Sequence, residues 1–95
     1  MRPSEYSAAL IAYAYCACMP GVIKVLPLCD NKGKICALYW ASVVGSVDVF
    51  CAILLRTRIT ETDLRFICQA GPPSITKRMF DMSERILLLA EHLSQ

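Results

Sequence analysis

Six apolar side chains recur at alternating spacings of four and three residues through the last stretch of the chain, 74–95. Side chains three and four residues apart share one face of an α-helix, so this pattern predicts a helix with a single apolar seam. Such a seam has to be buried, against neighbouring helices, a protein partner or a second copy of the chain. The seam residues are Ile75, Met79, Met82, Ile86, Leu89 and Leu93.

The start of this helix is marked by the residues before it. Pro72 and Pro73 disfavour a helical backbone at the positions preceding them, and the hydroxyl of Ser74 can accept a hydrogen bond from a free amide of the first turn. We therefore predict that Ser74 is the N-cap. Leu87 and Leu88 widen the apolar surface beyond the seam, which favours a bundle helix over a free coiled coil.

The whole chain has 95 residues, which is the size of one domain, and we predict that 1–95 forms a single helical domain. Its fold class is all-α, a small bundle of about four to five helices. The hydrophobic fraction of 56% exceeds the usual value of about 45–50%. A rich core, or apolar surface kept for a partner, would explain this surplus.

Two helices with marked ends are expected before the last one, in addition to the apolar run 35–55. Residues 6–18 are rich in alanine and carry apolar side chains at helical spacings, and Pro20 with Gly21 should end that helix. Thr60 with Asp63 resembles a capping box at the start of a second helix, which should end near Gly71.

Two short stretches lie between these helices. Residues 22–28 fit a short helix or an extended segment equally well. Residues 30–34 are the most polar stretch of the chain, and we interpret them as an exposed loop.

The apolar run 35–55 has two interpretations. It is long enough to cross a bilayer, and Arg56 and Arg58 follow it as a positive flank would. The favoured interpretation is a buried central helix. Asp48 is then a candidate buried charge, and we expect a carboxylate that packs against a neighbouring helix and is satisfied by a hydroxyl group or by a position at the rim. A membrane association is the less favoured alternative.

Six cysteines are present, and most of them lie in apolar runs where a thiol behaves as a small hydrophobic group. We expect reduced, packed cysteines. No cysteine pair has the CxxC spacing, and His92 is the only histidine, so we expect no metal and no cofactor. The run 8–19 has the length of a signal-peptide core, but Glu5 offsets Arg2, and we expect a cytoplasmic protein.

Residues 60–82 have the outline of a helix-turn-helix, in which a capped helix, a glycine turn and a second helix follow one another. Hydroxyl groups and cations at a helix N-terminus suit phosphates and base edges. The segment PPSITKRMFDM resembles the recognition helices of winged-helix repressors, although Thr76 stands where that family has a branched apolar residue. This resemblance implies a nucleic-acid contact through Ser74, Thr76, Lys77 and Arg78.

A protein-docking role is the favoured function. With one histidine and scattered carboxylates, the sequence offers no set of groups suited to acid–base or nucleophilic catalysis, so we expect neither an enzyme nor a small-molecule substrate. We predict an adaptor or inhibitor that binds a protein partner through apolar helix surface and forms a homodimer. The six seam residues of 74–95 are the predicted site of partner binding or dimerisation. Binding to DNA through 60–82 is the alternative, and the net charge of +2 does not by itself indicate a polyanion partner.

Overall fold

The protein is built of helices alone within the part of the chain that the structure describes. The structure is a computed structural model and describes the backbone of residues 3–93 and the side chains of residues 4–88. The predicted all-α class is confirmed, although six α-helices are present where four to five were expected. The elements are α1 (Pro3–Tyr15), α2 (Met19–Val25), the short 3-10 helix η1 (Leu26–Leu28), α3 (Asn31–Val44), α4 (Val47–Leu54), α5 (Glu61–Gln69) and α6 (Pro73–Leu93).

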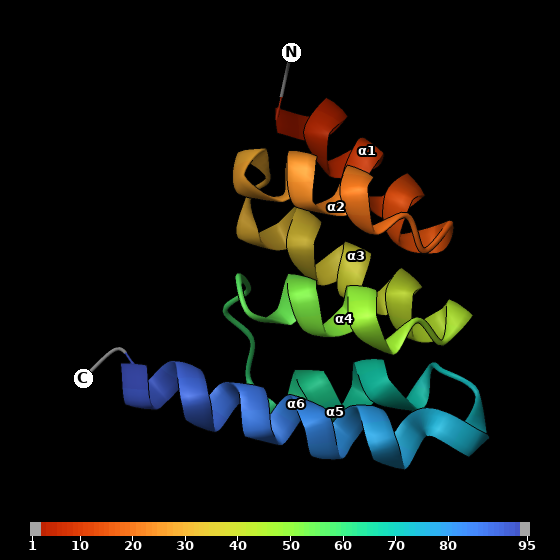
Figure 1. The fold of residues 1–95 in the computed structure, drawn as a ribbon, viewed down its shortest axis with the longest axis vertical. Coiled ribbons are helices and arrows are strands. Elements are labelled where there is room, and N and C mark those ends of the chain that lie inside the picture. The colour runs from red at the N-terminus through yellow and green to blue at the C-terminus, as the bar shows by residue number, and fades with distance from the viewer. Residues whose placement is uncertain (1–2, 94–95) are drawn as a thin grey trace.

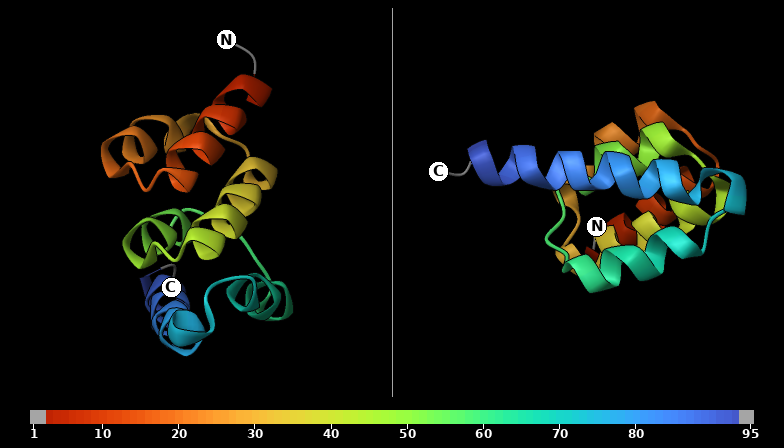
Figure 2. Two further views of the ribbon diagram at one scale, coloured as in Figure 1. Left: turned by 90° about the vertical axis from the view of Figure 1, so that its right-hand side faces the viewer. Right: turned by 90° about the horizontal axis from the view of Figure 1, so that it is seen from below.

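The helices form three pairs that stack on one another. In each pair the second helix packs against the first, and α3 lies between α1 and α5 while α4 lies between α2 and α6 (Figure 1). Seen from the side, the stack has two layers, one made of α1, α3 and α5 and the other of α2, α4 and α6 (Figure 2). Because each pair packs mainly on its neighbours, the fold grows along one axis, as helical repeat proteins do.

Equivalent positions in the three pairs carry equivalent side chains. In each pair a fully buried leucine lies seven residues before the turn residue. A small buried residue lies four residues after that leucine. Small side chains at that position let neighbouring pairs approach closely. The leucines are Leu10, Leu38 and Leu64, the small residues are Ala14, Ser42 and Cys68, and the turn residues are Ala17, Gly45 and Gly71.

The turn between α3 and α4 explains why 35–55 is not one long helix, which corrects the prediction of a single central helix. Gly45 adopts the left-handed conformation with φ of 76°, and its N–H bonds to the carbonyl groups at the end of α3. A residue in this conformation ends an α-helix, and glycine adopts it without steric cost. Asp48 then lies in the first turn of α4 and is exposed, so the prediction of a buried carboxylate was also wrong.

The turn between α1 and α2 also contains a residue in the left-handed conformation, but here that residue is an alanine. Ala17 has φ of 54°, and α1 ends at Tyr15, earlier than predicted. Pro20 and Gly21 were expected to end α1, but both lie inside α2. Proline is favoured in the first turn of a helix, where its missing N–H has no partner to lose.

Two further helix starts differ from the predictions. Residues 30–34 are not a loop, because the Asp30 carboxylate accepts a hydrogen bond of 2.8 Å from the Gly33 N–H and caps α3. Ser74 is not the N-cap of α6, because that helix already begins at Pro73. The predicted cap of α5 is confirmed, since Thr60 Oγ1 accepts a hydrogen bond from the Asp63 N–H.

The core runs along the axis of the stack. Its largest fully buried side chains come from all three pairs, which makes the three pairs one continuous apolar interior. No helix within residues 3–93 has both the length and the apolar character needed to cross a membrane. The core side chains include Leu10, Val22, Leu38, Phe50, Ile53, Leu64 and Met79.

Candidate interaction surface

The predicted seam of α6 faces the interior for most of its described length. Met79 is fully buried, and Ile75 and Ile86 are half-buried against the core. Met82 is half-buried as well. The seam therefore holds α6 onto α4 and α5, and the side chains of Leu89 and Leu93 lie outside the described residues.

The polar first turn of α6 lies at the surface. Ser74, Lys77 and Arg78 are exposed and line one shallow hollow, which Asp81 and Arg85 also line. The hydroxyl of Thr76 points back, because its Oγ1 donates a hydrogen bond of 3.1 Å to the Pro72 carbonyl. The hollow thus combines cations with a carboxylate.

The course of α6 bears on the helix-turn-helix hypothesis. After the turn, α6 runs back alongside α5 in the opposite direction (Figures 1 and 2). The two helices of a DNA-binding helix-turn-helix cross at about 90–120°. The pair α5 and α6 instead repeats the arrangement of the two pairs above it.

The layer of α1, α3 and α5 carries a group of exposed aromatic rings. The Trp40 ring makes edge-to-face contacts with Tyr15, at 5.8 Å between ring centroids, and with Tyr39, at 5.4 Å. These side chains remain 57% (Tyr15), 39% (Tyr39) and 37% (Trp40) exposed. We call these three residues the aromatic patch. Edge-to-face pairs hold the rings in place while leaving much of their surface in water.

A shallow hollow of about 400 Å³ lies beside the patch on α1 and α3. The lining side chains carry no charge. The small alanine side chains of α1 leave space beside the larger rings of Tyr15 and Trp40. Such a hollow can accept one apolar side chain from another molecule. Its lining residues are Ala8, Ile11, Ala12, Tyr15 and Trp40.

The stack repeats the aromatic position on α5. Trp40 lies five residues before Gly45, and Phe66 lies five residues before Gly71. Phe66 is 72% exposed, more than any other large hydrophobic side chain among the described residues. Because equivalent positions of stacked pairs face the same way, Phe66 faces the same side as Trp40, one pair further along the stack axis.

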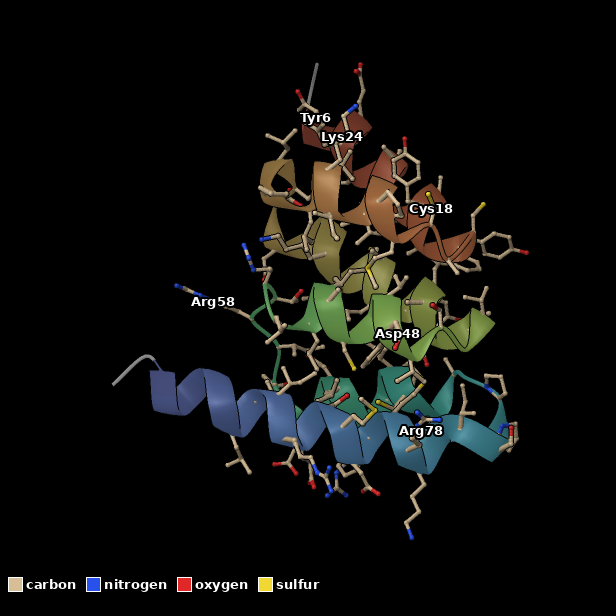
Figure 3. All side chains as sticks on the ribbon, in the orientation of Figure 1. Tyr6, Cys18, Lys24, Asp48, Arg58 and Arg78 are labelled. Carbon is tan, nitrogen blue, oxygen red and sulfur yellow. The ribbon has the colours of Figure 1, made fainter. Side chains whose placement is uncertain are left out.

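Four cations gather where α3 begins. Hydrogen bonds join this helix start to the connection between α4 and α5, and the Lys34 Nζ donates to the Arg56 carbonyl at 3.0 Å. Figure 3 shows the Arg58 side chain extending away from the helices. We call this group the cationic edge, made of Lys32, Lys34, Arg56 and Arg58.

Hydrogen bonds fix the backbone of the cationic edge. The Asn31 side chain bonds to both the N–H and the carbonyl of Arg58, each at 2.8 Å. Asp30, the residue before α3, is the carboxylate nearest in sequence to Lys32 and Lys34, and it caps the helix. The backbone that carries the cations is therefore fixed. The side chains of Lys32, Arg56 and Arg58 are exposed, while the Lys34 ammonium is held by the Arg56 carbonyl.

The open end of the stack carries charged side chains beside apolar ones. Between α5 and α6 lies a shallow hollow lined by Arg65, Lys77 and Phe80 among others, with the Arg65 guanidinium 5.0 Å from the centre of the Phe80 ring. Arg65 also pairs with Glu61 at 3.4 Å on the exposed side of α5. Terminal pairs of helical stacks need polar side chains on their outer face to remain in water.

All six cysteines are free thiols, but the prediction that they are packed is wrong for two of them. Cys16 and Cys36 are exposed, whereas burial raises the pKa of the Cys29, Cys51 and Cys68 thiols. The charge of Asp48 raises the Cys51 pKa further, while Arg78, which Figure 3 labels on α6 below α4, lowers it. Among the described residues, no three side chains of the kind that bind metals come together.

The aromatic patch was not predicted from the sequence, where the candidate site residues were those of the α6 seam and of the first turn of α6. The signal that could have revealed it is an internal repeat: LYWASVVG at 38–45 and LRFICQAG at 64–71 share a leucine, an aromatic residue two positions later and a terminal glycine. This repeat marks Trp40 and Phe66 as equivalent. The chain matches no protein-family model, no curated protein and no solved structure.

Proposed function

We propose that the protein is a non-enzymatic interaction module that binds a protein partner on the exposed face of α1, α3 and α5. The observation that carries the proposal is the aromatic patch, in which Trp40 is fixed between two tyrosines yet more than a third exposed. Tryptophan and tyrosine dominate the binding energy of many protein interfaces because they bury a large area at little cost in conformational entropy.

The architecture supports this role. Stacked helical pairs build an extended face from equivalent positions, and partners bind along such faces in repeat proteins. Phe66 adds an exposed ring on the same side, one pair further along the stack. The proposal places the partner on this face and leaves the seam of α6 to hold the stack together.

The partner can be a different protein or a second copy of the chain. The homodimer remains a prediction, and light scattering on the purified protein tests it. The six free cysteines favour a reducing compartment, so we expect the protein to act in the cytoplasm. Within the class of interaction modules, it would serve as an adaptor or as an inhibitor.

A paired capture experiment tests the proposal. The protein is immobilised as wild type, as Trp40→Ser with Phe66→Ser, and as the control Ile23→Ser with Leu28→Ser, which removes two exposed apolar side chains from α2 and η1. Proteins from a lysate of the encoding organism are then quantified. We expect specific partners to bind the wild type and the control but not the first variant. Equal capture by all three proteins would refute the proposed face.

DNA binding through the first turn of α6 is the competing proposal. Its support is the exposure of Lys77 and Arg78 beside Ser74. An electrophoretic shift with duplex DNA at low salt, lost steeply as salt rises, would support it. Absence of any shift at low salt would end it, and the antiparallel course of α6 leads us to favour the protein partner.

A further inference from the structure

The exposed face of α3 carries two kinds of side chain at a fixed separation. Lys32, Cys36 and Trp40 follow one another at intervals of four residues and are all exposed, so they lie along one stripe of the helix. Lys32 and Trp40 are eight residues apart, or about 12 Å along the helix axis. The cationic edge and the aromatic patch are therefore neighbours on one surface.

Both groups extend to the neighbouring helices of the layer. Tyr15 on α1 contacts Trp40, and Phe66 occupies the Trp40 position on α5. Lys32 and Arg58 are neighbours, since the side chain of Asn31, the residue before Lys32, bonds to the backbone of Arg58. Along the stack axis the surface thus has an apolar row and, beside it, a cationic row.

The separation of the two rows matches the width of an α-helix. A helix with its side chains is about 10–12 Å across, so one that lies along the stack axis would touch both rows at once. Adjacent helices in the layer are spaced by about 8–10 Å, which is about the rise of seven residues in the bound helix. Apolar residues at i and i+7 of that helix would then fall on Trp40 and Phe66.

We infer that the occupant of this face is an amphipathic helix of a protein partner, with an apolar stripe for the aromatic patch and acidic residues on the flank facing the cationic edge. This inference rests on the proposed function and specifies its partner. The charge complementarity carries it: the uncharged hollow beside Trp40 takes the apolar stripe, and Lys32 and Arg58 reach into solvent from a backbone that Asn31 holds in place. Opposite charges across an interface steer association and fix the register of the bound segment.

The probe is a synthetic amphipathic peptide of about 18 residues, or about five helical turns, with leucines on one stripe and glutamates on one flank. A matched peptide carries lysines in place of the glutamates. Trp40 is the only tryptophan of the chain, so its emission reports directly on the face. We expect the acidic peptide to shift this emission and to bind at least about tenfold more tightly than the basic one.

Charge-reversed variants locate the contact. Lys32→Glu with Arg58→Glu should weaken binding of the acidic peptide at least about tenfold, whereas the control Arg85→Glu on α6 should leave it within about twofold. Added salt should weaken binding to the wild type more than to the double variant. Each variant is checked for its helical circular dichroism.

Three results would overturn the inference: no change in Trp40 emission with the acidic peptide, equal binding of the basic peptide, or no effect of the double charge reversal. If these occur while the paired capture experiment still shows partners that depend on Trp40 and Phe66, the proposed function stands and only the acidic helix is wrong. Loss of both signals would reject the face altogether.

Discussion

The side chain of Asn31 pairs with the backbone of Arg58 through two hydrogen bonds of 2.8 Å, one donated by Nδ2 to the carbonyl and one accepted by Oδ1 from the N–H. The Asn31 side-chain amide thus satisfies both the N–H and the carbonyl of Arg58, as a paired backbone would in a β-sheet. It ties the connection between α4 and α5 to the start of α3, and thereby links the second and third pairs of the stack.

Asn31→Ala should therefore lower the free energy of unfolding by about 1–2 kcal/mol, because two hydrogen bonds are lost. Urea denaturation followed by circular dichroism measures the change. Lys32→Ala, on the next residue of the same helix, is the control and should cost less than about 0.5 kcal/mol. An equal loss in both variants would contradict the role assigned to the Asn31 pairing.

Two turn residues should respond in opposite directions when alanine and glycine are exchanged. Gly45→Ala places a Cβ at a φ of 76° and 2.8 Å from Ile75 Cδ1. Left-handed backbone alone costs a non-glycine residue about 1–2 kcal/mol, so we expect a loss of at least that size.

Ala17→Gly should stabilise the protein by less than about 1 kcal/mol, because the relief at φ of 54° is partly offset by the greater freedom of glycine in the unfolded chain. Thermal melts of the two variants beside the wild type give the comparison. A change of the same sign at both positions would show that backbone conformation does not set the stability of these turns.

The hydroxyl of Ser42 joins neighbouring pairs, since its Oγ donates a hydrogen bond of 2.7 Å to the Ile67 carbonyl of α5. The Thr57 hydroxyl is also buried but bonds to the Ile53 carbonyl, four residues earlier in the chain, at 2.7 Å. Ser42→Ala should cost about 1–2 kcal/mol and should raise the hydrogen exchange of α5 amides. Thr57→Ala should leave the exchange of α5 close to that of the wild type. The reverse pattern would place the contact between the pairs elsewhere.

The sequence predicts the features of this fold that depend on local patterns, and it fails for those that depend on contacts between helices. The α6 seam and the Thr60 cap are local patterns, and both predicted their helices correctly. The break at Gly45 was missed because hydropathy is continuous through 35–55, and a single glycine is compatible with a helix until the packing of α4 on α3 is known. The burial of Met79 depends in the same way on the stack, which places the α6 seam against α4 and α5.

The candidate surface was harder to predict for a related reason. Tyr15 and Trp40 are twenty-five residues apart and meet only because α1 and α3 are neighbours in one layer. Asp48 was misplaced because a carboxylate inside an apolar run looks buried until the helix break at Gly45 puts it in an exposed first turn. Both errors come from contacts between elements that no local pattern specifies.

The cysteines should divide into reactivity classes. Modification by a disulfide reagent requires a thiolate that the reagent can reach. Because Cys16 and Cys36 are exposed, they should react first at pH 8. Burial raises the pKa of Cys29, Cys51 and Cys68, so in the folded protein their thiolate fraction stays small at that pH and grows as the pH rises through the raised pKa. Mass spectrometry of partially modified protein identifies the sites. Early modification of Cys68 in folded protein would contradict its burial.

The accessibility of Trp40 in a complex with a captured partner tests the central claim most directly. Because the chain has a single tryptophan, acrylamide quenching of a complex reports on the aromatic patch, provided that the partner's own tryptophans are replaced by phenylalanine. We predict that binding lowers the quenching constant of Trp40 by about half or more, since interface cores exclude water. A bound complex in which Trp40 is quenched as readily as in the free protein would contradict the assignment of this face as the docking surface.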